Sequence, residues 1–305
     1  MAFKPSASRG ALAALVLLSL VWSYNWVVMK RALMYIGPFD FSALRYALGT
    51  VVLFMVLLVT RRSLRPPPLL PTLLAGLTQT MGFQALVQWA LVEGDAGKTA
   101  LLAYSMPFWV VLLAWGFLAE RLALTHLLGI IVAATGLLLV LEPWHGFGNL
   151  LSVGLALGGG LSWAVGTLIS KRMFNGGRTG VLQLTAWQML FGAIGLVLLA
   201  GLVDERSVTW SSYLVFAVLY NGVLSSGLAW LLWSMIVQRL PAHVAGLSSL
   251  AIPVMSVGFA WAFLGERPSL VETIGIGLIC AALAVVNRKP QADARVAVAD
   301  AAQSP

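Results

Sequence analysis

Long apolar stretches, separated by short turns rich in Gly, Pro and charged residues, run along almost the whole chain. A helix that crosses a hydrocarbon core of about 30 Å needs about 20 mainly apolar residues. Since lipid offers the backbone no hydrogen-bond partner, each stretch is expected to be a helix. The pattern predicts ten spans, at residues 10–30, 38–60, 69–91, 97–118, 123–141, 149–170, 179–202, 211–235, 243–264 and 269–287.

The composition supports a membrane protein and excludes a soluble one. Of the 305 residues, 60% are hydrophobic and only 10% are charged, whereas a soluble domain carries roughly 25% charged residues. The net charge of +8 does not indicate a nucleic-acid partner, because the basic residues lie between apolar stretches rather than in one patch. The first stretch has no small-residue cleavage site, so we interpret it as an uncleaved span.

The distribution of basic residues predicts the orientation in the membrane. With the N-terminus in the cytoplasm, most of the 19 Lys and Arg residues fall on the cytoplasmic side, as the positive-inside rule requires. Both termini are then cytoplasmic, and residues 289–305 form a tail that we expect to be disordered. The exceptions are Arg45, which lies within a span, and five residues on the outer side: Lys30, Arg31, Lys98, Arg206 and Arg267.

Two stretches have nearly the same sequence, WGFLAERLAL at residues 115–124 and WAFLGERPSL at residues 261–270. A shift of 146 residues aligns 96–140 with 242–286 without a gap. The shift pairs Pro107 with Pro253, and Glu120-Arg121 with Glu266-Arg267; a fainter correspondence, at a shift of 141, pairs Trp22 and Lys30-Arg31 with Trp163 and Lys171-Arg172. The chain is therefore predicted to consist of two similar units.

Each predicted unit holds five helices, the first in residues 1–142 and the second in residues 143–288. Because five is odd, the second unit enters the membrane from the opposite side, and the two units are inverted relative to each other. Inverted repeats are typical of secondary transporters, in which one repeat moves against the other around a central site. The predicted fold class is an all-α polytopic membrane protein with ten transmembrane helices around a central cavity.

The repeated pattern resembles a known family. A Pro within the fourth helix, an F-L-x-E-R end and a following Gly, repeated five helices later, resemble the EamA repeat of the drug/metabolite transporter superfamily. The stretch WSYNW at Trp22–Trp26 is most similar to the aromatic amino-acid exporter branch, the YddG type. The resemblance implies ten helices around a cavity and export of amino acids or related metabolites through a bacterial inner membrane.

Polar and aromatic residues at helical spacing identify the faces that we expect to line the cavity. In the first span, Trp22, Asn25, Trp26 and Met29 share one face. Asn and Gln within spans also hydrogen-bond neighbouring helices, so packing remains an alternative for the polar members. The predicted substrate-binding residues are Trp22, Asn25, Trp26, Gln79, Phe83, Tyr104, Trp163, Asn221 and Ser225.

A second set of residues is predicted to act in gating. Pro107 and Pro253 each remove a helical hydrogen bond, and they act either as bends that flex or as static features of the architecture. Two Glu-Arg pairs at helix ends, Glu120-Arg121 and Glu266-Arg267, are interpreted as helix-end locks or as solvated interfacial pairs. Lys30 and Arg31 are expected to reach the outer interface, and the role of Arg45 is left open.

The positions of the charged residues narrow the function. No Asp or Glu lies in the middle of a predicted span, which disfavours cationic drugs as substrates and proton coupling through a buried carboxylate. We therefore expect a facilitator of small neutral or zwitterionic metabolites, most like aromatic or apolar amino acids. The expected partners are this small-molecule substrate and membrane lipid, with no nucleic acid; the oligomeric state is left open.

Two alternatives belong to other classes. A carrier of phosphorylated or nucleotide sugars would need several cationic side chains in the cavity. An intramembrane hydrolase built on Ser225 or Ser226 would need a His at membrane depth, and all three His residues lie near segment ends. The chain has no HExxH motif and no Cys/His cluster, so we expect neither a metal nor a cofactor, and no enzymatic activity.

Overall fold

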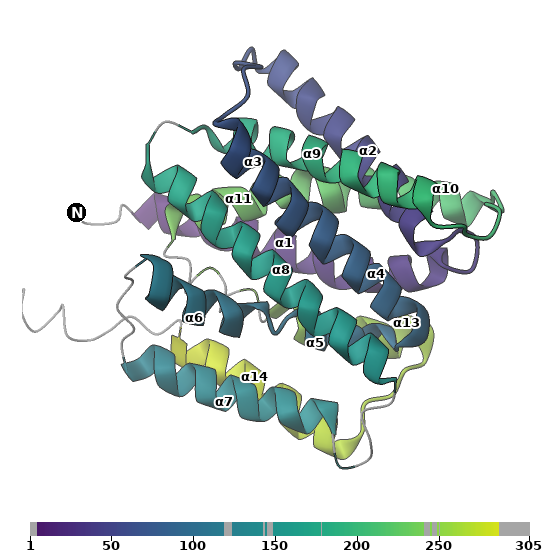
Figure 1. Ribbon diagram of the computed structural model, residues 1–305. Helices are drawn as coiled ribbons and strands as arrows, with labels where there is room; N and C mark the ends of the chain where they lie inside the picture. The colour runs from purple at the N-terminus through teal and green to yellow at the C-terminus, as the bar shows by residue number, and fades with distance from the viewer. Residues whose placement is uncertain are drawn as a thin grey trace, which may run out of the picture.

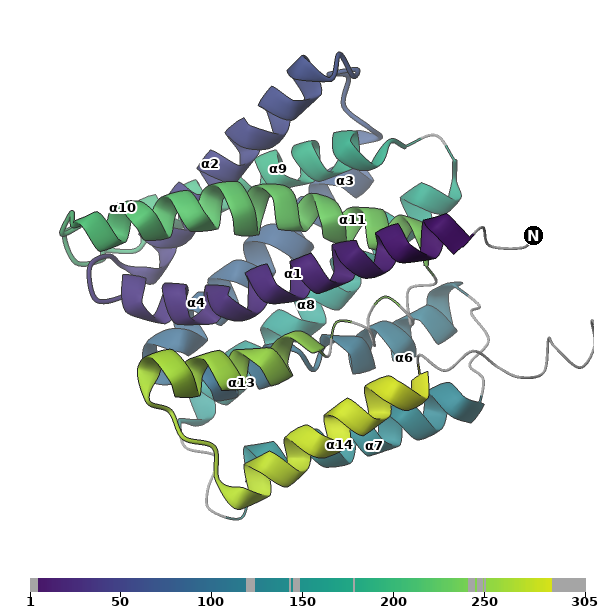
Figure 2. The ribbon, with the colours of Figure 1, turned by 180° about the vertical axis from the view of Figure 1, so that it is seen from behind.

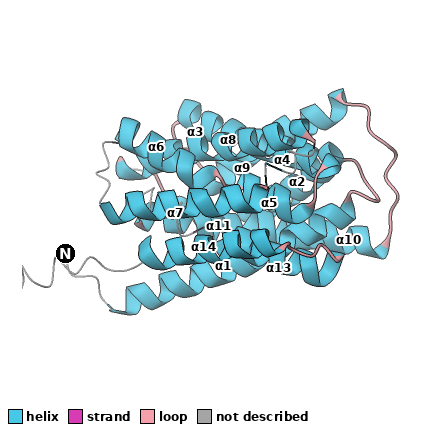
Figure 3. Cartoon of the chain, turned by 90° about the horizontal axis from the view of Figure 1, so that it is seen from below, coloured by secondary structure: helices cyan, strands magenta, loops and turns pink. Residues whose placement is uncertain are grey.

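The computed structural model of the chain is all-helical in the part that it describes, namely residues 5–118, 124–142, 144, 149–177, 179–240, 245, 249 and 251–286. Figure 3 shows these helices and the loops that join them, without a strand in the described residues. This is the secondary structure that lipid imposes, because a helix satisfies its backbone groups internally. Glu120, Arg121 and the predicted tail, residues 289–305, lie outside the described residues.

Helices occur in all ten predicted segments. Those of the first unit are α1 (Pro5–Ala32), α2 (Pro38–Val59), α3 (Leu69–Ala75), η1 (Gly76–Gly82), α4 (Phe83–Glu93), α5 (Ala96–Ala103), α6 (Met106–Leu118) and α7 (Leu124–Leu141). Those of the second unit are α8 (Leu150–Asn175), α9 (Val181–Leu202), α10 (Ser212–Leu219), η3 (Tyr220–Leu228), α11 (Ala229–Arg239), α13 (Ala251–Leu264) and α14 (Leu270–Val286). Figures 1 and 2 show them packed into one bundle.

Several of these helices are long and apolar enough to cross a membrane. Large apolar side chains also face outwards from the bundle, such as Phe117 at 72% and Leu202 at 83% exposed. A soluble protein rarely exposes so much contiguous apolar surface, so these side chains are placed to contact lipid. The long helices are Pro38–Val59, Ala96–Phe117, Leu150–Asn175, Val181–Leu202 and Ser212–Arg239, and shorter apolar helices cover Leu127–Val140, Ala251–Leu264 and Leu270–Ala282.

Two predicted spans are interrupted at equivalent places by π-helical turns that the sequence analysis did not predict. η1 interrupts the third span of the first unit, and η3 interrupts the corresponding span of the second unit. Each turn packs against a glycine of the second helix of the other unit. A Cβ atom added to Gly49 would lie 3.2 Å from the Gly222 carbonyl oxygen, and one added to Gly192 would lie 2.9 Å from that of Gly76. Single-turn π-helices often mark functional sites.

The fourth span of the first unit is also interrupted, at Tyr104 and Ser105, which separate α5 from α6. The bends predicted at Pro107 and Pro253 correspond to helix starts, because Pro107 is the second residue of α6 and Pro253 is the third residue of α13. The first turn of a helix tolerates Pro, since its N–H groups have no intrahelical acceptor. The prolines therefore begin helical segments rather than bend continuous ones.

Contacts between the two units are reciprocal. Several helix contacts have a counterpart in which the units exchange roles: α1 packs on α13 while α8 packs on α6, and α2 packs on η3 while α9 packs on η1. The equivalent helices α2 and α9 pack on each other, as do α7 and α14 at one edge of the bundle (Figures 1 and 2). Such self-complementary contacts are typical of two similar units related by a two-fold axis.

The equivalent first helices of the two units run in opposite directions. In Figures 1 and 2, α1 begins at the end of the bundle marked N, and α8 ends on that same side.

The closest approach of α7 and α14 depends on two glycines. A Cβ atom added to Gly136 would lie 2.6 Å from the Gly275 carbonyl oxygen, and one added to Gly275 would lie 2.5 Å from that of Gly136. Small residues allow helix backbones to approach this closely within a membrane. Gly277 lies two residues after Gly275 in α14, and a Cβ added to it would lie in open space.

Gly275 and Gly277, both in α14, give a matched test of the contact between α7 and α14. We expect Gly275→Ala to destabilise the protein by about 1–3 kcal/mol, because the added methyl group collides with backbone atoms. Gly277→Ala should leave stability unchanged or raise it slightly, since it gains helix propensity without a collision. Thermal unfolding midpoints in detergent measure both, and equal midpoints for the two variants would contradict the proposed close contact.

Candidate functional site

Two equivalent tryptophans, one from each unit, lie in contact at the centre of the bundle. The rings of Trp22 in α1 and Trp163 in α8 are 5.4 Å apart and nearly perpendicular, at 76°. Trp230 and Trp233 of α11 lie 5.6 and 6.0 Å from Trp22. Edge-to-face packing of this kind stabilises aromatic pairs by about 0.5–1.5 kcal/mol beyond the area that they bury. The cluster therefore joins the two units at their interface.

The two tryptophans also form equivalent hydrogen bonds across the interface. Trp22 Nε1 donates to the backbone carbonyl oxygen of Ser225 in η3, at 3.1 Å. Trp163 Nε1 donates to the amide oxygen of Gln79 in η1, at 3.2 Å, in the amide orientation that best satisfies the local hydrogen bonds. Ser225 and Gln79 are 146 residues apart, the same shift that relates the repeated motifs. Each unit thus fixes its tryptophan against the π-helical turn of the other.

A small cavity of about 30 Å³ lies beside this cluster. Its volume has room for about one or two water molecules. The walls come from both units, and most of the side chains are aromatic. The lining residues are Trp22, Asn25, Trp26, Met29, Arg45, Tyr46, Phe83, Gln84, Val87, Tyr104, Trp163, Ser225 and Trp230.

The structure brings most of the predicted substrate-binding residues together in this lining, with two exceptions. Gln79 is buried but lies behind Trp163, and its amide oxygen also accepts a hydrogen bond from Trp233 Nε1, at 3.3 Å. Asn221 is buried in η3, where its Nδ2 donates to the Ala217 carbonyl oxygen at 3.0 Å. Gln79 therefore positions the tryptophans, and neither residue contributes to the cavity lining.

Five lining residues were not predicted from the sequence, and two of them could have been found. The shift of 146 residues pairs Gln84 with Trp230. Extending the repeat alignment to the third span of each unit would have identified both of these positions. Val87 has no distinguishing pattern in an apolar helix. Arg45 and Tyr46 belong to α2, which the sequence analysis did not assign to the cavity.

Arg45 is the only charged residue in the lining, and its contacts among the described residues are all with neutral groups. Its Nε donates to Ser226 Oγ at 3.2 Å, and its Nη2 donates to Ser225 Oγ at 3.4 Å. Its Nη1 lies 2.7 Å from the sulfur of Met29. The guanidinium carbon lies 5.0 Å from the centre of the Tyr46 ring, within the range of a cation–π contact.

Asn25 presents a second unusual polar group in the lining. The residue is 5% exposed, and its Oδ1 is buried without a hydrogen-bond donor in the described part of the chain. A buried acceptor without a partner costs about 1–3 kcal/mol. The cavity therefore contains an available acceptor in α1 and a cation in α2.

Lysines at equivalent positions bind the ends of two helices. Lys30 Nζ donates to the carbonyl oxygens of Leu91 and Gly94 at the end of α4, at 2.9 and 2.8 Å. Lys171 Nζ donates to the carbonyl oxygens of Val237 and Leu240 at the end of α11, at 3.1 and 2.7 Å. These two residues lie 146 positions after Leu91 and Gly94. A cation at a helix C-terminus offsets the helix dipole. Lys30 therefore fixes a helix end, a contact that the sequence did not predict.

Glu266, one of the predicted gating residues, binds the start of α5. Its carboxylate accepts hydrogen bonds from the backbone N–H groups of Ala96, at 3.3 Å, and Gly97, at 3.1 Å. A carboxylate at a helix N-terminus stabilises the unpaired N–H groups there. Because Glu266 follows α13, this contact connects the fourth helices of the two units at one end of the bundle.

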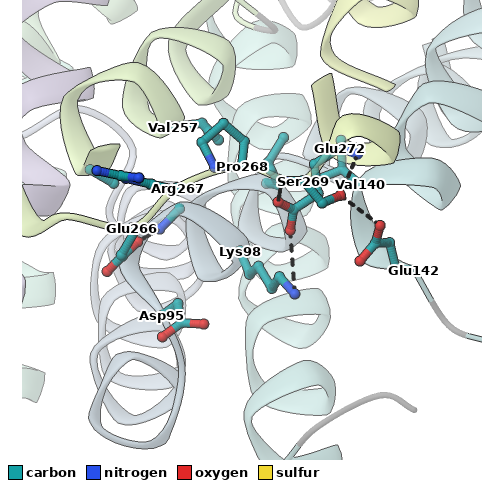
Figure 4. Close-up of a pocket in the computed structure, with 13 residues that line it drawn as sticks. Asp95, Lys98, Val140, Glu142, Val257, Glu266, Arg267, Pro268, Ser269 and Glu272 are labelled. Carbon is teal, nitrogen blue, oxygen red and sulfur yellow. Dashed lines mark hydrogen bonds and ion pairs between the residues drawn. The ribbon is translucent and has the colours of Figure 1, made fainter. Parts of the chain in front are cut away.

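A polar pocket of about 440 Å³ surrounds this contact (Figure 4). It contains the one ion pair of the described residues, between Lys98 and Glu272, at 3.3 Å. Ser269 and Glu272 cap the start of α14 by bonding each other's backbone N–H groups, which is the capping-box arrangement. Arg267 is exposed and extends away from Glu266 (Figure 4). The polar groups of this pocket are thus largely engaged in holding helix ends.

Comparisons with known proteins agree with this architecture. A probable amino-acid metabolite efflux pump of Salmonella typhimurium is 28% identical over 91% of this chain and 94% of its own length. A probable terminal-alkyne amino-acid exporter of Streptantibioticus cattleyicolor is 26% identical, over 92% and 94%. An uncharacterized transporter of Bacillus subtilis, YoaV, is 27% identical, over 87% and 92%.

One solved crystal structure matches 92% of this chain and 96% of its own, with a TM-score of 0.75 and 25% sequence identity. A family model, described as the EamA-like transporter family, matches residues 9–142 and again residues 150–288. The resemblance at the level of the family is therefore confirmed. The chain belongs to the EamA-like transporter family, and it is a multi-pass membrane transporter rather than an enzyme.

Proposed function

We propose that the protein transports amino acids with aromatic or apolar side chains, as expected from its resemblance to the aromatic amino-acid exporter branch. The observation that carries the proposal is the cavity between the two units, where aromatic walls surround a few polar groups. Such a lining matches a small molecule with an apolar side chain and a polar end. The names of two relatives, an efflux pump for amino-acid metabolites and an amino-acid exporter, support the same substrate class.

The proposed architecture is ten transmembrane helices in two inverted units, residues 1–142 and 143–288, with both termini in the cytoplasm of a bacterial-type cell. The reciprocal contacts between the units support it, as do the opposite directions of α1 and α8. In transporters built this way, binding sites lie between the repeats. The cavity lies between the units here as well, since Trp22 of the first unit and Trp163 of the second both line it.

We propose that transport occurs by alternating access, which the small size of the cavity supports. At about 30 Å³, the cavity is smaller than an amino acid, so helices of the two units must separate before a substrate enters. We propose that the Glu266 contact with α5 is one of the links that break and re-form as one side of the bundle opens. Glu120 and Arg121 are proposed to act at the opposite side, and the helix starts at Pro107 and Pro253 to serve as hinges.

Facilitated diffusion is the proposed energetic mode. The described lining residues include no Asp or Glu, which supports a mode in which no carboxylate there carries a proton with the substrate. A carrier of sugar phosphates would need several cationic side chains in the cavity. Two lysines that could serve are engaged elsewhere, because Lys30 binds a helix end and Lys98 pairs with Glu272.

A panel of labelled substrates in proteoliposomes tests the substrate class and the mode together. We expect uptake of L-phenylalanine and L-tryptophan down their gradients at the same rate with and without a pH gradient. Uptake that requires a pH gradient would contradict facilitated diffusion. Competition by sugar phosphates, but not by tryptophan, would instead favour the phosphorylated-sugar carrier.

The inverted arrangement predicts that equivalent motifs face opposite compartments. Cysteines introduced one at a time at Glu120 and Glu266, in a Cys280→Ser background, should differ in labelling of intact cells. A membrane-impermeant maleimide should label position 266 alone, and position 120 only after the membrane is opened. Labelling of both positions from outside would show that the two units are not inverted.

Two substitutions in the lining test whether the substrate binds there, and Asn25→Leu does so without removing a packing contact between the units. Asn25→Leu removes a buried oxygen that has no partner, so stability should hold or rise while transport falls by about tenfold, if that oxygen binds substrate. Trp163→Leu should lower transport by at least about tenfold through the loss of aromatic contacts. Trp261→Leu is the control, since Trp261 is exposed on α13. Normal transport by both lining variants would place the substrate elsewhere.

A further inference from the structure

We propose that Arg45 binds the carboxylate group of the transported substrate, so that the site selects molecules with a single negative charge at one end. This inference rests on the proposed function, because it places an amino acid in the same cavity. It also assigns a role to the one charged residue that lines that cavity.

The position of Arg45 gives its guanidinium access to a bound molecule. The residue lies in the first half of α2 and is only 2% exposed, yet it contributes to the cavity lining together with Asn25 and Tyr104. A charged side chain in the interior of a membrane protein is costly, and such residues commonly mark a substrate or ion pathway. Arg45 is therefore buried where a ligand would lie.

The guanidinium has no charged partner among the described residues, and it retains unused donors. Among the described residues, Arg45 contacts the hydroxyl groups of Ser225 and Ser226, the sulfur of Met29 and the ring of Tyr46. The single ion pair in that part of the chain is between Lys98 and Glu272. A guanidinium carries five N–H donors, and the contacts with Ser225, Ser226 and Met29 use three of them. The remaining donors suit a carboxylate, which accepts two parallel hydrogen bonds from arginine.

The equivalent residue in the second unit shows that the fold does not require a charge here. α2 and α9 correspond at a shift of 143 residues, which pairs Gly49 with Gly192 and Arg45 with Gln188. Gln188 is buried, at 1% exposed, and it accepts a neutral hydrogen bond from Ser170 Oγ at 3.3 Å. A neutral amide thus fills the equivalent place beside the other π-helical turn. The positive charge is specific to the side of the interface that lines the cavity.

The charge balance identifies the class of ligand. In the part of the lining that the structure describes there is one cation and no Asp or Glu. One carboxylate neutralises that cation, whereas a sugar phosphate carries about two negative charges near neutral pH. A simple amine would be repelled. An α-amino acid fits if its carboxylate contacts Arg45, its ammonium group approaches Asn25 Oδ1, and its side chain packs against Trp22 and Trp163.

The first experiment changes the ligand and leaves the protein intact. Uptake of labelled L-phenylalanine into proteoliposomes is competed with unlabelled L-phenylalanine, L-phenylalaninamide, 3-phenylpropionate or glucose 6-phosphate. We expect the amide, which lacks the carboxylate, to compete at least about tenfold less well than phenylalanine. 3-Phenylpropionate should compete better than the amide, and glucose 6-phosphate should not compete. Equal competition by phenylalanine and its amide would overturn the assignment of Arg45.

The second experiment changes the residue. Arg45→Gln copies the equivalent residue Gln188, so the packing has a precedent within the same fold. It should raise the half-saturating phenylalanine concentration by at least about tenfold and abolish the preference for phenylalanine over its amide. Arg45→Lys should restore part of that preference, because lysine keeps the charge but loses the two parallel donors. Arg172→Gln, which removes a charge from an exposed helix end, should change neither quantity.

The outcomes separate the two proposals. If wild-type protein transports phenylalanine and Arg45→Gln retains the full preference for it over the amide, the role of Arg45 is wrong while the proposed function stands. If wild-type protein ignores phenylalanine but transports 3-phenylpropionate in an Arg45-dependent way, amino-acid transport is wrong while the carboxylate site stands. If it transports glucose 6-phosphate instead, both are wrong.

Discussion

The structure depends on the contact between Trp22 and Trp163, the equivalent side chains of the two units. Each indole donates its N–H group to the π-helical turn of the other unit, and the two rings pack edge to face between them. Buried polar atoms require partners, so these hydrogen bonds fix the register of the interface as well as its distance. The cavity lies beside this pair, and both tryptophans contribute to its lining.

The π-helical turns explain how polar chemistry reaches the centre of an apolar bundle. A wider turn displaces its residues towards the helix of the other unit, and Gly49 and Gly192 leave the space for that approach. On one side the turn supplies the Ser225 and Ser226 hydroxyl groups that hold the Arg45 guanidinium. On the other side its Gln79 amide holds tryptophans. The two units thus share an architecture but differ in charge, which is the asymmetry that an amino acid, with its two different ends, would require.

The ends of the helices are held by charges that the bundle itself neutralises. Lys30 and Lys171 bind carbonyl oxygens at equivalent helix C-termini, while the Glu266 carboxylate binds the N–H groups that begin α5. Lys171 is itself buried, so the two carbonyl dipoles that it contacts offset its charge. In the proposed cycle, the Glu266 contact is a link that changes as one side opens.

The sequence by itself determined the helical class, the ten apolar segments and the two similar units, because lipid leaves the backbone few alternatives and a shift of 146 residues is visible without coordinates. It also identified most of the cavity lining, including Trp22, Phe83 and Trp163, since helical spacing places such residues on one face. Only the tertiary structure revealed the π-helical turns, since the apolar pattern continues through them unchanged. It also decided the contacts of Gln79, Lys30 and Arg45. Whether a polar side chain faces a cavity, another side chain or a helix end depends on which helices are neighbours, and that information lies in contacts between residues far apart in the chain.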